Sequence, residues 1–241
     1  MRVGLILCGR LPDRYKGISG DYPALISGMF GNRDISLEVF ESHLGSLPRD
    51  FAASDGIIIS GSPQSVYEDE EWIRDLEAFA REVADSTTPV FGICFGHQLL
   101  ARALGGVVEQ AESGWGVGVH TMRVLEHRPW MEPDREVLKL VMSHQDQVVD
   151  LPGGAVVLGS SDHCRNYLIE FTSTCIGIQG HPEFTTAFAR ALYEDKQALI
   201  GTLADEAIES LATPADTRIV QQWVRNLFGE SLAADSQQQP G

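Results

Sequence analysis

The 241-residue chain carries 34 acidic and 18 basic side chains, and its formal net charge is −16 at pH 7. Nucleic-acid binding relies on a basic face that neutralises phosphates, so this charge balance argues against a nucleic-acid partner and favours small molecules or proteins. No apolar run reaches the roughly 18 residues of a membrane span, and the N-terminal stretch is too short for a secretory signal. We therefore expect a cytoplasmic protein with no membrane partner.

The first half of the chain alternates short apolar, β-branched runs with segments of helical composition. This alternation is typical of an α/β fold with buried parallel strands. The predicted strands lie at residues 2–8, 35–40, 56–60 and 90–93. Apolar side chains three and four residues apart predict a helix over residues 69–85, and a second helix over 97–104 ends at Gly105 and Gly106.

The second half is rich in predicted strands joined by short Gly, Pro and Asp turns. These strands lie at residues 117–124, 140–149, 155–160, 167–171 and 175–179. Helices return after Phe184, and the last one is predicted to begin with Thr213 as N-cap and Pro214 in the first helical position. We expect one domain over residues 1–230 and a disordered tail over residues 231–241.

The cysteines are scattered without the Cys-x-x-Cys spacing of a zinc or redox pair, so we expect four reduced thiols. They are Cys8, Cys94, Cys164 and Cys175. His120, His127 and His163 also lack the spacing of metal ligands and are interpreted as surface or core histidines. The sequence therefore predicts neither a metal nor a cofactor.

Cys94 stands where the strand at residues 90–93 turns into a helix, between Gly92 and Gly96. This Gly-x-Cys-x-Gly pattern is the thiol form of the nucleophile elbow, in which the glycines permit a tight turn that exposes the nucleophile. The N-terminus of the following helix favours the thiolate, and ligands of α/β sheets bind at this end of the strands. The alternative is a buried cysteine in a glycine-containing turn.

A thiol nucleophile needs a base, and the base needs an orienting partner. His97 lies three residues after Cys94, but its ring direction is set by their common helix. His181 follows the strand at 175–179, and Glu183 comes two residues later, a spacing that lets its carboxylate reach the ring. We predict a triad of Cys94, His181 and Glu183. On its own, His-Pro-Glu is more often the start of a helix.

An oxyanion hole requires backbone N–H groups beside the nucleophile. Phe95, directly after Cys94, supplies one. The turn after the strand at 56–60 supplies another, from Gly61 or Ser62. An ordinary strand-end turn is the alternative interpretation. Trp115 and Tyr22, in glycine-rich segments, are candidates for the mouth of the site or for packing.

Three motifs in series resemble those of class I, triad-type glutamine amidotransferase domains. They are Ser-Gly-Ser-Pro (60–63), Gly-Ile-Cys-Phe-Gly-His-Gln (92–98) and Gly-His-Pro-Glu (180–183). The resemblance implies a three-layer, flavodoxin-like fold with a largely parallel central sheet flanked by helices. It also implies that Cys94 forms a γ-glutamyl thioester, that His181 is the general base and acid, and that Glu183 orients it. The positions implied for glutamyl binding are Gln98 and the backbone of Ser143, His144 and Gln145.

The chain resembles both γ-glutamyl peptidases and the amidotransferase domain of GMP synthase, and two departures make it look closer to the stand-alone branch that includes the peptidases. The motif Gly-Ser-Pro replaces the Gly-Gly-Pro of many members, and residues 10–23 are predicted to form a long loop. No GxxxxGK[ST] phosphate loop is present. Either ammonia passes to a separate synthetase subunit, or water is the final acceptor.

We therefore predict a glutamine amidotransferase or glutaminase that releases ammonia from glutamine. The alternative is a γ-glutamyl peptidase that acts on glutathione-like compounds. A redox sensor or a non-catalytic binding protein with an elbow cysteine is the alternative from another functional class.

Overall fold

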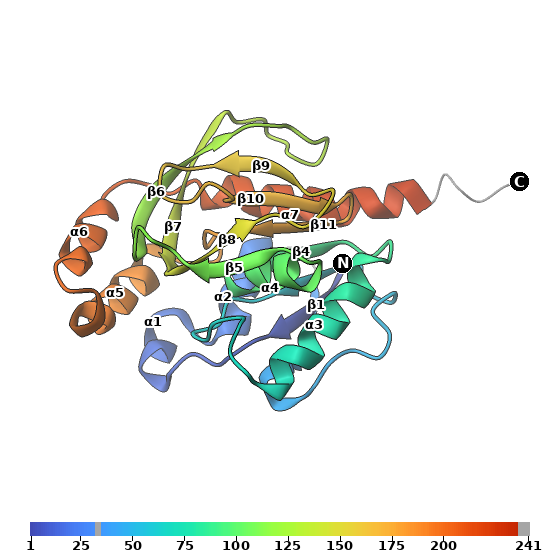
Figure 1. Cartoon of the computed structure of the whole chain (residues 1–241), viewed down its shortest axis with the longest axis horizontal. Coiled ribbons are helices and arrows are strands. Elements are labelled where there is room, and N and C mark those ends of the chain that lie inside the picture. The colour runs from blue at the N-terminus through green and yellow to red at the C-terminus, as the bar shows by residue number, and fades with distance from the viewer. Residues whose placement is uncertain (32–34, 236–241) are drawn as a thin grey trace, which may run out of the picture.

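The fold is built on a nine-stranded sheet, drawn in Figure 1, and the computed structural model describes residues 1–31 and 35–235. Across the sheet the strands are β2 (Ser36–Glu41), β1 (Arg2–Leu7), β3 (Gly56–Ile59), β4 (Val90–Ile93), β11 (Cys175–Ile178), β10 (Leu168–Thr172), β9 (Val156–Ser160), β6 (Gly116–Val124) and β7 (Val137–His144). A second sheet pairs β5 (Val107–Gln110) with β8 (Asp146–Asp150).

The sheet changes character at β11. From β2 to β11 neighbouring strands are parallel, and from β11 to β7 they are antiparallel. Every residue of β3, β4 and β11 is buried, because parallel strands in the middle of an α/β sheet are covered on both faces. The predicted α/β class is confirmed, and the β-rich second half supplies the antiparallel part.

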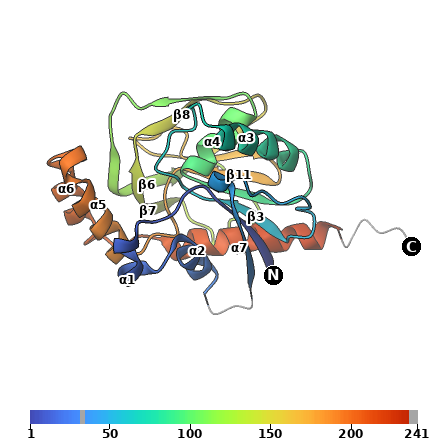
Figure 2. The same cartoon turned by 90° about the horizontal axis from the view of Figure 1, so that it is seen from below.

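The helices of the fold are α1 (Lys16–Ser19), α2 (Tyr22–Phe30), α3 (Glu71–Ala84), α4 (Phe95–Ala103), α5 (Thr186–Ile200), α6 (Leu203–Ser210) and α7 (Thr217–Asp235). Among them, α2 and α7 cover one face of the parallel strands and α3 and α4 cover the other (Figure 2), so the fold has three layers. Val3, Leu5 and Leu7 of β1 belong to the core under α2 and α7, whereas Ile6 belongs to the core under α3 and α4. The two-residue period of a strand thus divides its side chains between two apolar layers. Among the described residues, no helix is long and apolar enough to cross a membrane.

Residues 140–149, predicted as one strand, form two. Strand β7 ends at His144, which pairs with Gly116 of β6, and β8 begins at Asp146, which pairs with Gln110 of β5. Gln145 is the point of transfer, and its carbonyl accepts a hydrogen bond from the Ala111 N–H at 2.8 Å. The single-strand prediction is wrong because the chain changes pairing partner inside a continuous apolar run.

The last helix begins at Thr217, so the predicted N-cap at Thr213 and first turn at Pro214 are wrong. Asp216 is held on the edge strand β7, where its N–H donates to the Lys139 carbonyl at 2.7 Å and its carboxylate accepts from the Lys139 N–H at 2.8 Å. These bonds keep Asp216 outside the helix. The helix continues to Asp235, and residues 236–241 of the predicted tail lie outside the described residues.

Residues 10–23, predicted as a loop, contain a short 3₁₀ turn (Asp13–Tyr15), helix α1 and the first residues of α2. The Asp21 carboxylate caps α2 by accepting the Ala24 N–H at 2.9 Å. The segment is anchored by Tyr15 and Tyr22, which are 3% and 5% exposed. It is therefore an ordered wall beside the carboxyl ends of the parallel strands.

Candidate active site

The predicted site residues meet where β3, β4 and β11 end. Ile93 of β4 pairs with Ile178 of β11, and Gly92 pairs with Ile59 of β3, so the residues that follow these three strands leave the sheet side by side. A Cβ atom placed on Gly61 would lie 3.4 Å from His181 Cε1 and 3.9 Å from Cys94 Cβ. Three motifs that lie between residues 60 and 183 of the chain thus share one edge of the sheet.

Cys94 occupies a strained corner. Among the non-glycine residues that the structure describes, Cys94 alone has a positive φ, which is 50°. The Cys94 N–H is fixed by the Ile178 carbonyl at 2.8 Å, and α4 begins at the next residue, Phe95. Backbone strain of this kind is characteristic of functional sites, and this geometry is that of a nucleophile elbow.

The glycines beside Cys94 are required by close packing, and the positive φ falls on Cys94 itself. A Cβ atom on Gly96 would lie 2.3 Å from the Ile59 carbonyl oxygen, and one on Gly92 would lie 2.6 Å from the Gly96 backbone. The corner fits against β3 only because both residues lack a side chain.

We expect Gly96→Ala to lower the free energy of unfolding by about 1–3 kcal/mol or more, since the added methyl group meets backbone atoms that cannot move independently. Gly17→Ala is the matched control, because no atom lies within 4 Å of a Cβ placed there. Urea unfolding measures both. Equal urea midpoints for the two variants would contradict the packing explanation.

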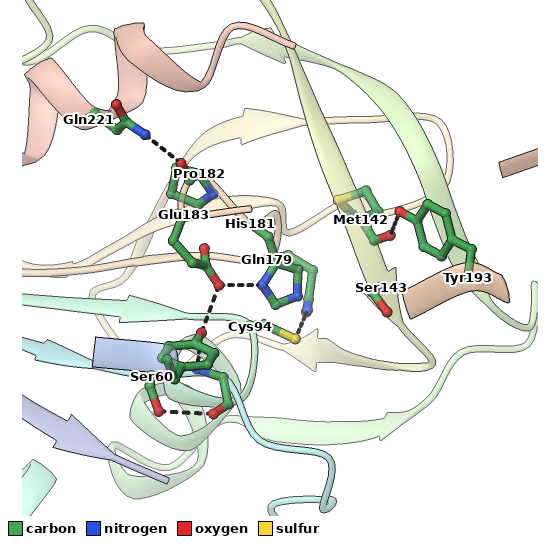
Figure 3. Close-up of polar contacts among 12 residues, drawn as sticks. Ser60, Cys94, Met142, Ser143, Gln179, His181, Pro182, Glu183, Tyr193 and Gln221 are labelled. Carbon is green, nitrogen blue, oxygen red and sulfur yellow. Dashed lines mark hydrogen bonds and ion pairs between the residues drawn. The ribbon is translucent and has the colours of Figure 1, made fainter. Parts of the chain in front are cut away.

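His181 and Glu183 form a buried pair. The His181 Nδ1 lies 2.8 Å from Glu183 Oε1, and the two residues are 4% and 3% exposed. Phe184 stacks on the His181 ring with the centroids 4.0 Å apart and the planes at 10°. With Nδ1 engaged by the carboxylate, the other ring nitrogen lies on the side of the Cys94 sulfur (Figure 3).

The charge on this pair is set by its surroundings. Burial lowers the pKa of His181, but the negative charges of Glu183 and Cys94 outweigh it, and this pKa rises to about 10. The arrangement thus favours the imidazolium form of His181. All four cysteines are free, and burial raises the pKa of the other three thiols to about 12, which keeps them protonated. These three are Cys8, Cys164 and Cys175.

Tyr22 links the Glu183 carboxylate to the turn at Gly61. Its hydroxyl donates to Glu183 Oε1 at 2.7 Å and accepts the Gly61 N–H at 3.1 Å. Burial and the charge of Glu183 raise the pKa of Tyr22 well above its ordinary value, so the hydroxyl keeps its proton. In the sequence analysis, Tyr22 is a candidate for the mouth of the site or for a packing role. The contact with Glu183 spans 161 positions, and no local spacing signals it.

Removing the Tyr22 hydroxyl is expected to destabilise the fold. Tyr22→Phe removes a buried hydrogen bond to a charged group, which contributes about 1.5–3 kcal/mol. Tyr67→Phe provides the comparison, because the Tyr67 hydroxyl donates to Asp146 Oδ1 at 2.9 Å on a side chain that is 45% exposed. Urea titration should give the Tyr67 variant a loss below about 1 kcal/mol. If the two variants lose the same amount of unfolding free energy, the buried bond from Tyr22 to Glu183 does not contribute as proposed.

Gln179, which is not named as a site residue in the sequence analysis, is fully buried beside Cys94. Its side-chain NH₂ group donates to Cys94 Sγ at 3.5 Å, and its oxygen accepts from Gln98 Nε2 at 3.1 Å. Gln98 also donates to the Asp146 carbonyl at 2.7 Å. Gln98, predicted to bind substrate, therefore holds Gln179 against the thiol. The position of Gln179, directly after β11, was the available signal.

The predicted oxyanion donors differ in their present partners. The Gly61 N–H is bonded to the Tyr22 hydroxyl. The Phe95 N–H stands at the first position of α4, where an amide has no partner inside the helix. The Ser62 hydroxyl accepts the Gln64 N–H at 3.3 Å and so shapes the turn. Phe95 and Ser62 remain the predicted donors that are not committed to Tyr22.

The predicted glutamyl-binding residues line one cavity of about 330 Å³ that opens on Cys94. These residues are Gln98, Ser143, His144 and Gln145. Trp115 lies in the same wall, which fits a place at the mouth. Burial lowers the pKa of His144 to about 3, so its ring is neutral there.

The other histidines do not line this cavity, although His163 contacts the His144 ring edge to face with the centroids 5.6 Å apart. His97 is fully buried against Phe171, with its ring on β11, and burial lowers its pKa to about 4. His120 and His163 contact each other edge to face, and His127 pairs with Asp134 at 2.7 Å. Among residues 1–31 and 35–235, no group of three His, Cys, Asp or Glu side chains is arranged to hold a metal ion.

Comparison with known proteins gives concordant matches. Residues 21–197 match the sequence model of the family Glutamine amidotransferase class-I. Gamma-glutamyl peptidase 3 of Arabidopsis thaliana is 28% identical over 232 residues, which cover 92% of this chain and 93% of that protein. The glutamine-hydrolyzing GMP synthase of Macrococcus caseolyticus is 39% identical over 131 residues, which cover 53% of this chain and 24% of the synthase. A glutamine amidotransferase crystal structure from Thermotoga maritima superposes with a TM-score of 0.77 at 19% identity, covering 96% and 98% of the two chains.

Proposed function

Because this chain belongs to the class-I glutamine amidotransferase family, we propose that it hydrolyses γ-glutamyl amide bonds through a γ-glutamyl thioester on Cys94. The observation that supports this proposal is the convergence on adjacent parallel strands of a strained elbow cysteine and a buried His181–Glu183 pair. A thiol, a base within reach and a carboxylate that orients the base are the parts that thiol acyl transfer requires.

The proposed reaction has two halves. In the first, the Cys94 thiolate attacks the γ-carbonyl carbon, the carbon–nitrogen bond breaks, and His181 gives its proton to the departing nitrogen. In the second, His181 takes a proton from water, the hydroxide oxygen attacks the thioester carbon, and the sulfur leaves as thiolate. The sum is γ-glutamyl amide plus water giving glutamate plus amine, or ammonia when the substrate is glutamine.

Glu183 and the backbone have separate tasks in this scheme. The carboxylate fixes Nδ1 as the protonated ring nitrogen and stabilises the imidazolium, as the orienting acid of a triad does. The N–H groups of Phe95 and Ser62 receive the oxyanion that forms on the γ-carbonyl oxygen. Gln179 donates to the sulfur, which stabilises the thiolate before attack and after release.

Glutamine and larger γ-glutamyl compounds are both substrates that this chemistry admits. The similarity to the amidotransferase part of a GMP synthase supports glutamine, with ammonia passed to a separate synthetase subunit. The similarity to a γ-glutamyl peptidase along nearly the whole chain supports γ-glutamyl compounds, with water as the acceptor.

The test is to incubate the purified chain with L-glutamine and with γ-glutamyl dipeptides, and to measure glutamate and the released amine separately. A γ-glutamyl chloroketone should label Cys94, identified by mass spectrometry, and leave Cys164 and Cys175 unlabelled. Release of glutamate with labelling of Cys94 is the expected result. If no compound releases glutamate and peroxide oxidises Cys94 selectively, the redox-sensor alternative replaces the proposal.

A further inference from the structure

Two cavities meet at Cys94. One is the cavity of about 330 Å³ lined by the predicted glutamyl-binding residues, and the other, of about 320 Å³, lies on the side of residues 10–15 and α5. Cys94, Ser143 and Lys196 line both. A γ-glutamyl compound that reacts at Cys94 has its glutamyl part on one side of the thiol and its leaving amine on the other. The geometry therefore assigns the second cavity to the leaving amine.

The second cavity is far larger than ammonia requires. A molecule the size of water or ammonia occupies about 30 Å³, so the available volume is roughly tenfold greater. Its walls are mainly apolar and aromatic, and they present a surface that a hydrocarbon side chain can bury. The apolar wall consists of Leu11, Tyr15, Phe184, Phe188 and Leu192. An amine with an apolar side chain fits this cavity.

The cations around the cavity are not equivalent. Arg10 pairs with Glu41 at 2.6 Å, and the Arg14 side chain pairs with Asp195. Lys196, at the junction of the two cavities, has no acidic partner among the residues that the structure describes. Its charge is available to a ligand.

Lys196 is held in place by neutral groups. Its Nζ donates to the Ser143 hydroxyl at 2.9 Å and lies 4.7 Å from the centroid of the Trp115 ring. Burial lowers the pKa of Lys196, and the charge of Cys94 offsets only part of the loss of water around the ammonium group, since no carboxylate pairs with it. A substrate carboxylate beside Nζ would supply the remaining compensation.

We propose that Lys196 binds the carboxylate of the leaving amino acid while the apolar wall of the second cavity binds its side chain. The substrate class is γ-glutamyl amino acids whose leaving residue has an apolar side chain and a free carboxylate. Glutamine, which leaves the second cavity empty, is a poor substrate. This inference rests on the proposed function, and it adds a binding site and a substrate class to it.

Four substrates separate the contributions of the carboxylate and the side chain. γ-Glutamyl-phenylalanine has both, γ-glutamyl-phenethylamide lacks the carboxylate, γ-glutamyl-glycine lacks the side chain, and glutamine lacks both. We expect kcat/KM to be highest for γ-glutamyl-phenylalanine. It should exceed the values for γ-glutamyl-phenethylamide and γ-glutamyl-glycine by at least about 10-fold, and the value for glutamine by about 100-fold.

The variants Lys196→Met, Lys196→Arg and Arg190→Met identify the residue responsible. We expect Lys196→Met to lower kcat/KM for γ-glutamyl-phenylalanine by about 10- to 100-fold, and for γ-glutamyl-phenethylamide by less than about 3-fold. Lys196→Arg should restore part of the loss. Arg190→Met removes a cation from an exposed position of the same helix and should change neither value.

Each outcome has one meaning. The assignment of Lys196 is overturned if Lys196→Met lowers kcat/KM equally for γ-glutamyl-phenylalanine and γ-glutamyl-phenethylamide. The assignment of the second cavity is overturned if the wild type prefers glutamine. Neither result contradicts γ-glutamyl hydrolysis itself. If no compound is hydrolysed, the proposed function fails, and calorimetric titration of Cys94→Ala with γ-glutamyl-phenylalanine decides the cavity assignment. Binding at least about 10-fold weaker after Lys196→Met supports the assignment, and unchanged binding overturns it.

Discussion

Replacing Cys94 with alanine is expected to lower kcat for every γ-glutamyl substrate by at least about 1000-fold, because the proposed covalent intermediate forms on this sulfur and no other group replaces it. The side chain is small and only 6% exposed, so the change removes the reacting atom with little loss of packing. The protein should therefore keep its fold and its affinity for substrate.

Cys175→Ala is the matched control. Cys175 is also buried and free, but it lies at the start of β11, on the opposite end of the strand from the site. The Cys175→Ala variant should keep the wild-type kcat. Glutamate release measured under identical conditions, with circular dichroism to verify folding, decides the question. A folded Cys94→Ala protein with more than a tenth of wild-type kcat would rule out the thioester route.

Replacing Glu183 with glutamine is expected to lower kcat by roughly 100- to 10,000-fold with little change in the shape of the site. The carboxylate accepts the proton of His181 Nδ1 and raises the pKa of that ring. A neutral amide removes this stabilisation of the imidazolium, and its NH₂ group, if turned toward Nδ1, selects the wrong tautomer. Both effects reduce the supply of a proton to the leaving nitrogen.

The pH profile distinguishes this role from simple packing. In the wild type, kcat/KM should fall as the pH rises through about 10, where His181 loses its proton. In Glu183→Gln the alkaline limb should move to lower pH, because the charge that raises this pKa is gone. Glu82→Gln, at an exposed position of α3, should leave the limb in place. An unshifted limb in Glu183→Gln would show that the carboxylate does not act on His181.

Stability should follow the same protonation. The pKa of His181 is raised above its ordinary value of 6.5, so the folded state holds this proton more tightly than the unfolded chain does. This contribution to stability is complete below pH 6.5 and is lost as the pH rises through about 10. The free energy of unfolding should therefore fall over this range in the wild type and fall less in Glu183→Gln.

Much of the architecture follows from local patterns. Apolar runs four to seven residues long predict strands, because parallel strands covered on both faces are apolar throughout. The four N-terminal strands appear within one residue of their predicted ends, although β2, at the edge of the sheet, is largely exposed. The Gly92-x-Cys94-x-Gly96 corner is predictable from a short motif, and the adjacent strands β3 and β11 then hold it in place. His181 and Glu183 are close because only one residue separates them.

The α/β class, the corner at Cys94 and the His-Pro-Glu segment follow from the sequence alone, since each depends mainly on interactions between near neighbours. The break at Gln145, the start of α7 at Thr217, the bond from Tyr22 to Glu183 and the position of Lys196 between two cavities arise only in the folded chain. Each of these joins residues far apart in the chain through a strand register or a buried polar contact. Their energies arise only when the sheet has assembled, so no local pattern encodes them.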